Sequence, residues 1–164
     1  NGEHGRKLME EWAEPDLAMK DATPGSNKKL SWRCSAGCTK DGEAFTWEAK
    51  VSNRTRSIRG GCPGCPGQSP TDQNNLLKWC QDNGEHGRKL IGEWAEPDLA
   101  MKDVTPSSGK KMSWRCSAGC MKDGEAFMWQ AIVGSRTSPE PRGCPGCNPR
   151  APISLQKRLG KAAR

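Results

Sequence analysis

Hydrophobic residues occur in short stretches along this chain, and the spacing within each stretch indicates one kind of element. Between residues 5 and 14, Leu8 and Trp12 lie four positions apart and share one face of a predicted helix. Pro15 follows directly and is expected to end that helix. Residues 87–96 repeat the pattern and predict a second helix of the same kind.

Alternating apolar and polar residues follow each predicted helix. From residue 44 to 51 the alternation predicts a strand with one apolar face, and residues 126–133 repeat it. A shorter strand is predicted at residues 30–33, and Asp41 and Gly42 form a turn signal between the two strands. These elements predict a β-hairpin in each half of the chain.

The two halves are copies of each other. Residues 1–65 and 83–147 align without a gap, and every matched position recurs 82 residues later. Eight of the nine cysteines obey this period and form two sets of four. They are Cys34, Cys38, Cys62, Cys65, Cys116, Cys120, Cys144 and Cys147.

Each set of four cysteines has the spacing of a tetrahedral thiolate site. Two close pairs separated by a hairpin-length loop are typical of a structural Zn²⁺ site. Disulfide-stapled domains and iron sites are the alternatives, but a Cys-Pro-Gly-Cys run suits two thiolates on one metal better than bonds to distant partners. We therefore expect two Zn²⁺, one in each half. His4 and His86 share one repeat position and are expected to be surface or capping residues, not ligands.

The composition supports a metal-stabilised fold. Each repeat has a size at which a hydrophobic core alone is marginal, and only 33% of the residues are hydrophobic. Zinc binding by small peptides contributes about 10–16 kcal/mol, which becomes folding free energy. Tryptophan is the exception to the poor core, since six of the seven form matched pairs, expected to pack around the metal sites. The pairs are Trp12 with Trp94, Trp32 with Trp114, and Trp47 with Trp129.

Residues 66–82 form a predicted linker whose second half is a helix. Leu76 to Cys80 have helical spacing, and Thr71 or Asp72 could cap the helix. This helix precedes the second repeat directly and is expected to belong to it. The ninth cysteine ends its apolar face and is expected to be a buried free thiol. The counterpart in the first repeat would precede the first residue, which predicts a longer precursor with further repeats.

Residues 148–164 depart from the repeat and carry a basic excess. The chain has a formal net charge of +7, to which this tail contributes +5. Leu155 and Leu159 lie four apart beside Lys157 and Arg158, so the tail could be an amphipathic helix. Such a tail could bind an acidic protein surface, RNA or an anionic membrane surface, or it could be solvated. Two Zn(Cys)₄ sites would bring the net charge nearer +3, which weakens the case for nucleic-acid binding.

Matched basic residues are the other candidates for binding. The lysine pairs are expected to be solvated loop charges or phosphate contacts. The matched arginines are expected to buttress loop carbonyls or to contact a partner. The candidate partner or phosphate contacts are Lys28, Lys29, Arg54, Lys110, Lys111, Arg136, Lys157, Arg158 and Lys161.

The combined motifs resemble a family of small zinc modules, called zinc-ribbon or treble-clef domains and often found in tandem. Cys38 and Cys120 stand where that family usually has His, and Ser31 and Ser113 where it often has a second Trp. The resemblance covers roughly residues 1–147. The motifs that carry it are Glu11-Trp12, Thr23 to Lys29, Trp32 to Cys38, Phe45 to Val51, Asn53-Arg54-Thr55 and Gly61 to Cys65.

The resemblance implies a small α+β, metal-stabilised fold: two tandem treble-clef/zinc-ribbon modules, each with a zinc knuckle, a β-hairpin and short helices. We expect module 1 at 1–65, a linker at 66–82 with a helix of module 2, module 2 at 83–147, and the basic tail at 148–164.

Zinc closed by four cysteines argues against catalysis, because a catalytic zinc keeps an open position. We expect a structural or interaction subunit of a larger assembly that docks through surface loops, the linker helix and the basic tail. A nucleic-acid-binding protein, of RNA or DNA, is the alternative; some members of the resembled family are fused to nuclease domains, so this is an analogy only. Reduced thiols predict an intracellular, reducing compartment, with an organelle interior as an option after removal of a targeting peptide. No run of about 18 apolar residues is present to span a membrane.

Overall fold

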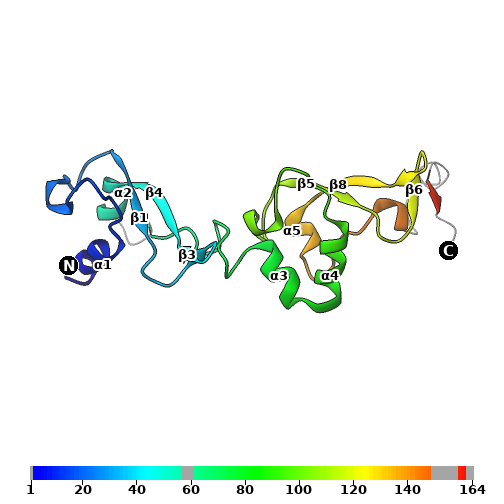
Figure 1. The fold of residues 1–164 in the computed structure, drawn as a ribbon, viewed down its shortest axis with the longest axis horizontal. Coiled ribbons are helices and arrows are strands. Elements are labelled where there is room, and N and C mark those ends of the chain that lie inside the picture. Colours follow the sequence, from blue (N-terminus) through cyan, green and yellow to red (C-terminus); the bar gives the residue numbers. More distant parts are fainter. Residues whose placement is uncertain (1, 57–60, 149–158, 162–164) are drawn as a thin grey trace. The chain divides into compact units, whose positions relative to one another are not determined.

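The computed structural model describes residues 2–56, 61–148 and 159–161, and the chain divides into two compact units (Figure 1). The first unit runs from Asn1 to Asn74 and the second from Asn75 to Arg164. The boundary lies inside the predicted linker, 66–82. The loop half of the linker packs with the first unit and the helical half with the second.

Over residues 2–56 and 61–74, the first unit has two small antiparallel sheets and three helical segments. Strand β1 pairs with β4, so that Trp32 lies opposite Trp47, and β2 pairs with β3 in the zinc-knuckle hairpin. The elements are α1 (Gly2–Glu11), η1 (Met19–Asp21), β1 (Lys29–Arg33), β2 (Thr39–Lys40), β3 (Glu43–Ala44), β4 (Thr46–Lys50) and α2 (Val51–Arg56).

The second unit repeats this order and has one more helix at its start. Strand β5 pairs with β8, with Trp114 opposite Trp129, and β6 pairs with β7. The elements are α3 (Leu76–Asp82), α4 (Gly84–Glu93), η3 (Met101–Asp103), β5 (Lys111–Arg115), β6 (Cys120–Lys122), β7 (Glu125–Ala126), β8 (Met128–Ile132), α5 (Val133–Arg136), η4 (Pro145–Cys147) and β9 (Gly160–Lys161).

Helix α1 ends three residues before the predicted position, because Trp12 is drawn into the sheet. Trp12 forms a β-bridge with Trp32, and its indole N–H donates to the carbonyl of Leu17 at 2.9 Å. The two indole rings meet edge to face, with centroids 5.4 Å apart. Trp32 is almost fully buried, so the predicted tryptophan core is confirmed, and it is also what sets the end of the helix.

The predicted strand at 44–51 is interrupted at Phe45, which belongs to neither β3 nor β4. Its backbone N–H donates to the carbonyl of Cys38 at 2.8 Å, and its carbonyl accepts from the N–H of Cys34 at 2.9 Å. The strand then ends at Lys50, and α2 begins at the next residue, Val51. One residue between two short strands therefore fixes the backbone of both cysteines of the knuckle.

Helix α3 lies where it is predicted, but a different residue caps it. The side chain of Asn75 accepts from the backbone N–H of Lys78 at 2.8 Å, which is the N-cap geometry. The prediction of Thr71 or Asp72 as cap is wrong. Asp72 instead accepts from the backbone N–H groups of Asp41 and Gly42 at the tip of the knuckle hairpin, both at 3.0 Å.

Most of the basic tail lies outside the described residues, including the predicted amphipathic helix up to residue 158. At residues 160 and 161 the backbone pairs with β6 as a third strand, with Lys161 opposite Cys120. Within the described ranges, none of the helices is both long and apolar enough to cross a membrane.

Candidate metal centres

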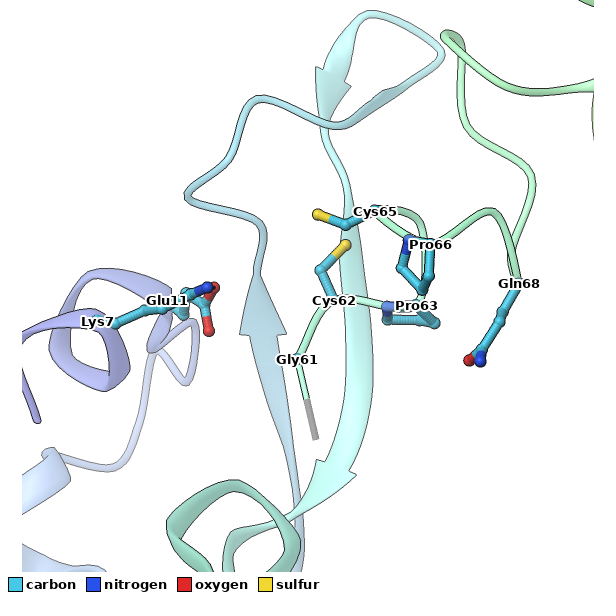
Figure 2. Close-up of a pocket in the computed structure, with 8 residues that line it drawn as sticks. All are labelled: Lys7, Glu11, Gly61, Cys62, Pro63, Cys65, Pro66 and Gln68. Atoms are coloured by element: carbon cyan, nitrogen blue, oxygen red, sulfur yellow. The ribbon is translucent and has the colours of Figure 1, made fainter. Parts of the chain in front are cut away.

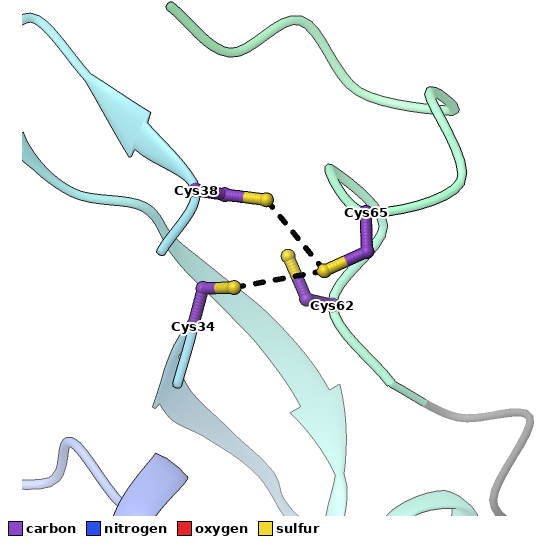
Figure 3. A group of neighbouring side chains, drawn as sticks. All are labelled: Cys34, Cys38, Cys62 and Cys65. Atoms are coloured by element: carbon purple, nitrogen blue, oxygen red, sulfur yellow. Dashed lines mark hydrogen bonds between the residues drawn. The ribbon is translucent and has the colours of Figure 1, made fainter. Parts of the chain in front are cut away.

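The four cysteines of each half converge on one point. Figure 3 shows the thiols of the first cluster turned toward a common centre, two from the knuckle and two from the Cys-Pro-Gly-Cys loop. In each cluster the four sulfur atoms all lie within 4.8 Å of one another. The clusters are Cys34, Cys38, Cys62 and Cys65 in the first unit, and Cys116, Cys120, Cys144 and Cys147 in the second.

The spacing of the sulfurs fits a metal and not a disulfide. Four Zn–S bonds of about 2.3 Å in a tetrahedron place neighbouring sulfurs about 3.8 Å apart. The Cys65 sulfur lies 3.7 Å from that of Cys34 and 3.6 Å from that of Cys38. A disulfide requires about 2.05 Å, and all nine cysteines are free thiols. The residues therefore fit Zn²⁺, which would supply a closed structural centre in each unit.

Glycine is required in both loops that carry the cysteines, by its positive φ in the first and by lack of space in the second. Gly37, between the two knuckle cysteines, has a φ of +87°, a conformation that glycine adopts without steric cost. In the Cys-Pro-Gly-Cys loop, a Cβ placed on Gly64 would lie 2.6 Å from the side chain of Thr71. The side chain of Asn74 also donates to the Gly64 carbonyl at 2.7 Å. The loop after the second cysteine pair thus holds that pair in place.

Burial and neighbouring groups separate the thiols by acidity. Burial raises the pKa of Cys62 and of Cys144 to about 11. At Cys34 burial also raises the pKa, but backbone hydrogen bonds from Cys38 and Ala36 and contacts with neighbouring thiols outweigh it, and the pKa falls to about 7. Without a metal these clusters hold protons at neutral pH, and zinc binding would replace those protons with its own charge.

One thiol of each cluster faces solvent. Cys65 and Cys147 are exposed, whereas Cys34 and Cys62 and their counterparts are buried. A pocket of about 240 Å³ lies on this side of the first cluster. It is lined by the Cys-Pro-Gly-Cys loop and by the side chains of Lys7 and Glu11 on α1 (Figure 2). Access to the metal is therefore expected from the side of the second cysteine pair.

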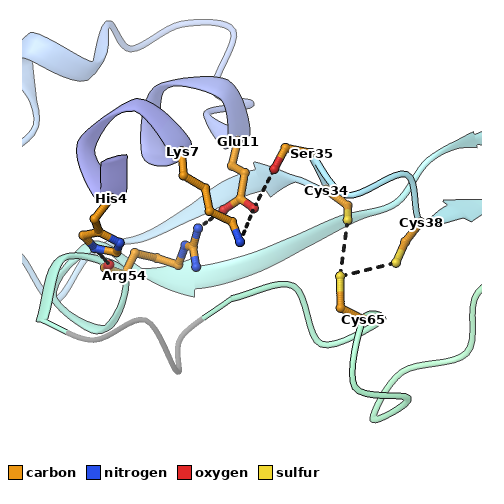
Figure 4. Close-up of polar contacts among 8 residues, drawn as sticks. All are labelled: His4, Lys7, Glu11, Cys34, Ser35, Cys38, Arg54 and Cys65. Atoms are coloured by element: carbon orange, nitrogen blue, oxygen red, sulfur yellow. Dashed lines mark hydrogen bonds and ion pairs between the residues drawn. The ribbon is translucent and has the colours of Figure 1, made fainter. Parts of the chain in front are cut away.

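A buried ion pair lies beside each metal centre. Glu11 on α1 accepts from the guanidinium of Arg54 on α2, and it also accepts from the hydroxyl of Ser35 in the knuckle at 3.1 Å (Figure 4). The second unit repeats both contacts, with Glu93 in place of Glu11. One carboxylate thus joins the first helix, the second helix and the zinc knuckle.

The guanidinium of Arg54 is enclosed on several sides. It stacks 4.9 Å from the ring centre of Trp32 and 5.5 Å from that of Trp47. Burial lowers the pKa of this guanidinium, and the neighbouring Cys62 offsets part of that shift. His4 contacts the backbone carbonyl of Arg54 at 3.0 Å. His4 is therefore partly buried and connects α1 to α2. The prediction of a surface or capping residue did not include this contact.

The structure places the predicted contact residues in three different environments. The four paired lysines are exposed, so they remain candidates for a partner or phosphate contact. Arg54 and Arg136 are buried and ion-paired, which favours the predicted buttress: the Arg136 guanidinium donates to the Arg142 carbonyl at 2.7 Å. Lys157 and Arg158 lie outside the described residues, and Lys161 is described only through its backbone pairing with β6.

The sequence motifs include Glu11, but no buried partner was predicted for Glu11 or Glu93, although a signal was present. Each lies three positions after the buried leucine of its helix, so each falls on the inward face. An acidic residue repeated on an apolar helix face indicates a buried partner of opposite charge.

A known protein-family model matches each half of the chain. The family model described as Probable Treble clef zinc finger domain matches the chain twice, over residues 8–68 and 90–150. Both matches contain a complete set of four cysteines. Among curated proteins, nothing matches the chain.

Proposed function

Because the chain belongs to the family of probable treble clef zinc finger domains, with two tandem zinc modules, we propose that it works as a non-enzymatic interaction subunit of a larger assembly. Each metal centre uses four cysteines, so no coordination position is left for substrate or water. The same closed, thiolate-rich sites suit an intracellular, reducing compartment. The modules then serve as rigid supports for binding surfaces.

The observation that carries the proposal is the outer face of the β5–β8 sheet. On this face Met128 is 48% exposed and Ile132 is 37% exposed. Lys111 pairs with Ile132 and Arg115 with Met128, so cationic residues flank the apolar ones. The second unit therefore presents an apolar strip, formed by Met128 and Ile132 with the polar Gln130 between them, and this strip has a basic border.

The first unit has no such strip at the matching positions. There Thr46 and Lys50 replace Met128 and Ile132, and Glu48 lies between them. Two copies of one fold thus differ in the chemistry of one exposed face while keeping the same tryptophans, buried ion pair and cysteines. Because apolar residues on an outer strand face cost solubility and add nothing to the core, they favour a protein partner.

Nucleic-acid binding is the second candidate, and the exposed lysine pairs favour it. Lys28-Lys29 and Lys110-Lys111 occupy matched loop and strand-start positions on both units. Two observations weaken this candidate. The matched arginines are buried, and the bound metals with their thiolates would bring the formal charge of the chain from +7 to nearer +3.

Replacing the strip by its first-unit counterpart tests the proposal. The double substitution Met128→Thr with Ile132→Lys in the full zinc-loaded chain should abolish co-purification of specific protein partners, measured by quantitative mass spectrometry. Zinc content and circular dichroism should stay unchanged, because both side chains are exposed. Ile91→Lys, at another exposed apolar residue of the same unit, is the matched control and should retain the partners.

A salt titration distinguishes the second candidate. Anisotropy of labelled RNA or duplex DNA should show only weak binding at low salt if the chain is an interaction subunit. Tight binding whose logarithm falls steeply with log salt, and which is lost on replacing the four lysines by glutamate, would establish the nucleic-acid function instead. Partners that persist unchanged in the Met128/Ile132 variant would refute the assignment of the strip.

A further inference from the structure

In the second unit, helix α3 fills an apolar groove formed by α4 and η3. Figure 1 shows α3 alongside α4. Leu76 and Cys80, one turn apart on α3, are almost fully buried and belong to the hydrophobic core of that unit. The backbone N–H of Leu76 also donates to the carbonyl of Val104 at 2.7 Å. The helix is therefore part of the core and not only a connection.

The backbone of α3 passes directly over a glycine of α4. A Cβ placed on Gly87 would lie 1.7 Å from the carbonyl oxygen of Cys80 and 2.7 Å from its Cα. No larger residue fits without displacing the helix. Near the start of α4, the ring of His86 packs edge to face with the ring of Trp79 on α3, and the ring centroids are 5.3 Å apart. Gly87 and His86 together form the seat of α3.

The first unit has the same groove, built from residues at the repeat positions of those that surround α3. It has a volume of about 360 Å³ and is largely apolar. Its lining includes Gly5, Leu8, Trp12, Met19, Ala22 and Val51. Each of these six lies 82 positions before a residue of the second unit. Five recur unchanged, and at position 104 valine replaces the alanine of position 22.

No helix fills this groove among the described residues. A Cβ on Gly5 would meet nothing within 4 Å, in contrast to Gly87. Met19 and Ala22 are partly exposed, whereas their counterparts Met101 and Val104 are buried. The core cluster found in the first unit is correspondingly smaller than that of the second and is confined to residues near the metal centre.

Glycine at position 5 has no explanation within the first unit alone. A glycine inside a helix destabilises it relative to alanine, and here the space for a side chain is available. At Gly87 the same residue is required by the close approach of α3. The first unit thus has both residues that contact α3 in the second unit, with Gly5 in place of Gly87 and His4 in place of His86.

We propose that the groove of the first unit binds a further helix of the α3 type. Such a helix is amphipathic, with Leu and Cys four positions apart on its buried side, Trp three positions after the Leu, and an Asn cap before them. The helix α3 of this chain cannot be the occupant, because it is committed to the core of its own unit. The occupant is a segment from another copy of the repeat, held against Gly5 as Cys80 is held against Gly87.

A chain extended by one more copy of this helix tests the proposal. Adding a copy of residues 70–82 directly before Asn1 recreates the junction found at 82–83. The extension should raise the thermal unfolding midpoint of the first unit by roughly 5 °C or more. It should also shift the ring resonances of His4 in NMR spectra, because the added tryptophan would pack on that ring. An extension with aspartate in place of its Leu and Cys is the matched control and should give neither effect.

Substitution of Gly5 gives the decisive comparison. In the chain without the extension, Gly5→Ala should raise the midpoint slightly, since alanine favours a helix and meets no neighbour. In the extended chain the same substitution should lower it, because the methyl group would collide with the docked backbone. The same sign in both chains, or an extension without effect, would overturn the proposal. The proposal would also be overturned if the unextended chain formed a dimer in sedimentation experiments and Gly5→Leu dissociated it. A second copy of the chain would then occupy the groove.

Discussion

Glu93 and Arg136 form a buried ion pair at the junction of α4, α5 and the zinc knuckle. Their side chains are 1% and 2% exposed, and the hydroxyl of Ser117 donates to the same carboxylate at 2.7 Å. His86 contacts the backbone carbonyl of Arg136 at 2.8 Å. The pair therefore connects the helices to the loop that holds the metal, and Glu11 with Arg54 does the same in the first unit.

Removal of one partner of this pair should destabilise the second unit strongly. Arg136→Met leaves the carboxylate of Glu93 buried without its cation, which costs about 3–5 kcal/mol in comparable sites. Urea unfolding of the zinc-loaded chain measures the loss. The double variant Arg136→Met with Glu93→Leu should recover much of it. Lys78→Met, which breaks the exposed pair with Asp82, is the control and should cost at most about 0.5 kcal/mol. If Arg136→Met and Lys78→Met lost equal amounts of unfolding free energy, this account would be contradicted.

Metal content should follow the cysteines one unit at a time. We expect two zinc ions per chain by elemental analysis, and one ion after Cys34→Ser with Cys62→Ser, because the second cluster is complete in itself. The second unit should stay folded in that variant, while the first unfolds for lack of a sufficient core. A mass that reveals sulfur–sulfur bonds, or a content well below two in the unmodified chain, would exclude the assignment.

Cys80, the one cysteine outside the two metal centres, should be unreactive in the folded chain. It is buried on α3, and burial raises its pKa to about 11. Since the folded state holds this proton more tightly, its contribution to stability is complete below the ordinary pKa near 8.5 and is lost as the pH rises toward 11. Iodoacetamide at neutral pH should leave Cys80 unmodified in the zinc-loaded chain and should modify it after unfolding. Rapid labelling of the folded chain would show that α3 is not packed as described.

The tip of the first knuckle should depend on Asp72. Its carboxylate accepts from the N–H groups of Asp41 and Gly42, where the backbone has positive φ values of 54° and 82°. Asp72→Ala should destabilise the first unit by about 1–2 kcal/mol and speed zinc transfer to a competing chelator, because charge-assisted hydrogen bonds hold the hairpin. Gln68→Ala, in the same loop, is the control. Unchanged transfer rates would show that the knuckle is held by its metal alone.

The sequence by itself determined the parts of this protein that depend on spacing. The 82-residue period, the two cysteine quartets and the extra helix before the second repeat are local patterns, and the structure contains all of them. Four thiolates at those spacings can meet only around a common centre, and Leu76 and Cys80 can share a face only in a helix. The fold class followed from these constraints.

Only the tertiary structure decided which residues meet across the chain. The ion pair of Glu11 with Arg54 joins positions 43 residues apart, and the contact of His4 with Arg54 spans 50. No periodicity links such positions, so the sequence left Arg54 open as a buttress or a partner contact. The structure shows that the Arg54 guanidinium is buried between two indole rings. A cation in such surroundings needs a buried carboxylate beside it, and Glu11 provides one. The groove at Gly5 is of the same kind: its glycine is visible in the sequence, but its purpose appears only where Gly87 carries a helix on the same seat.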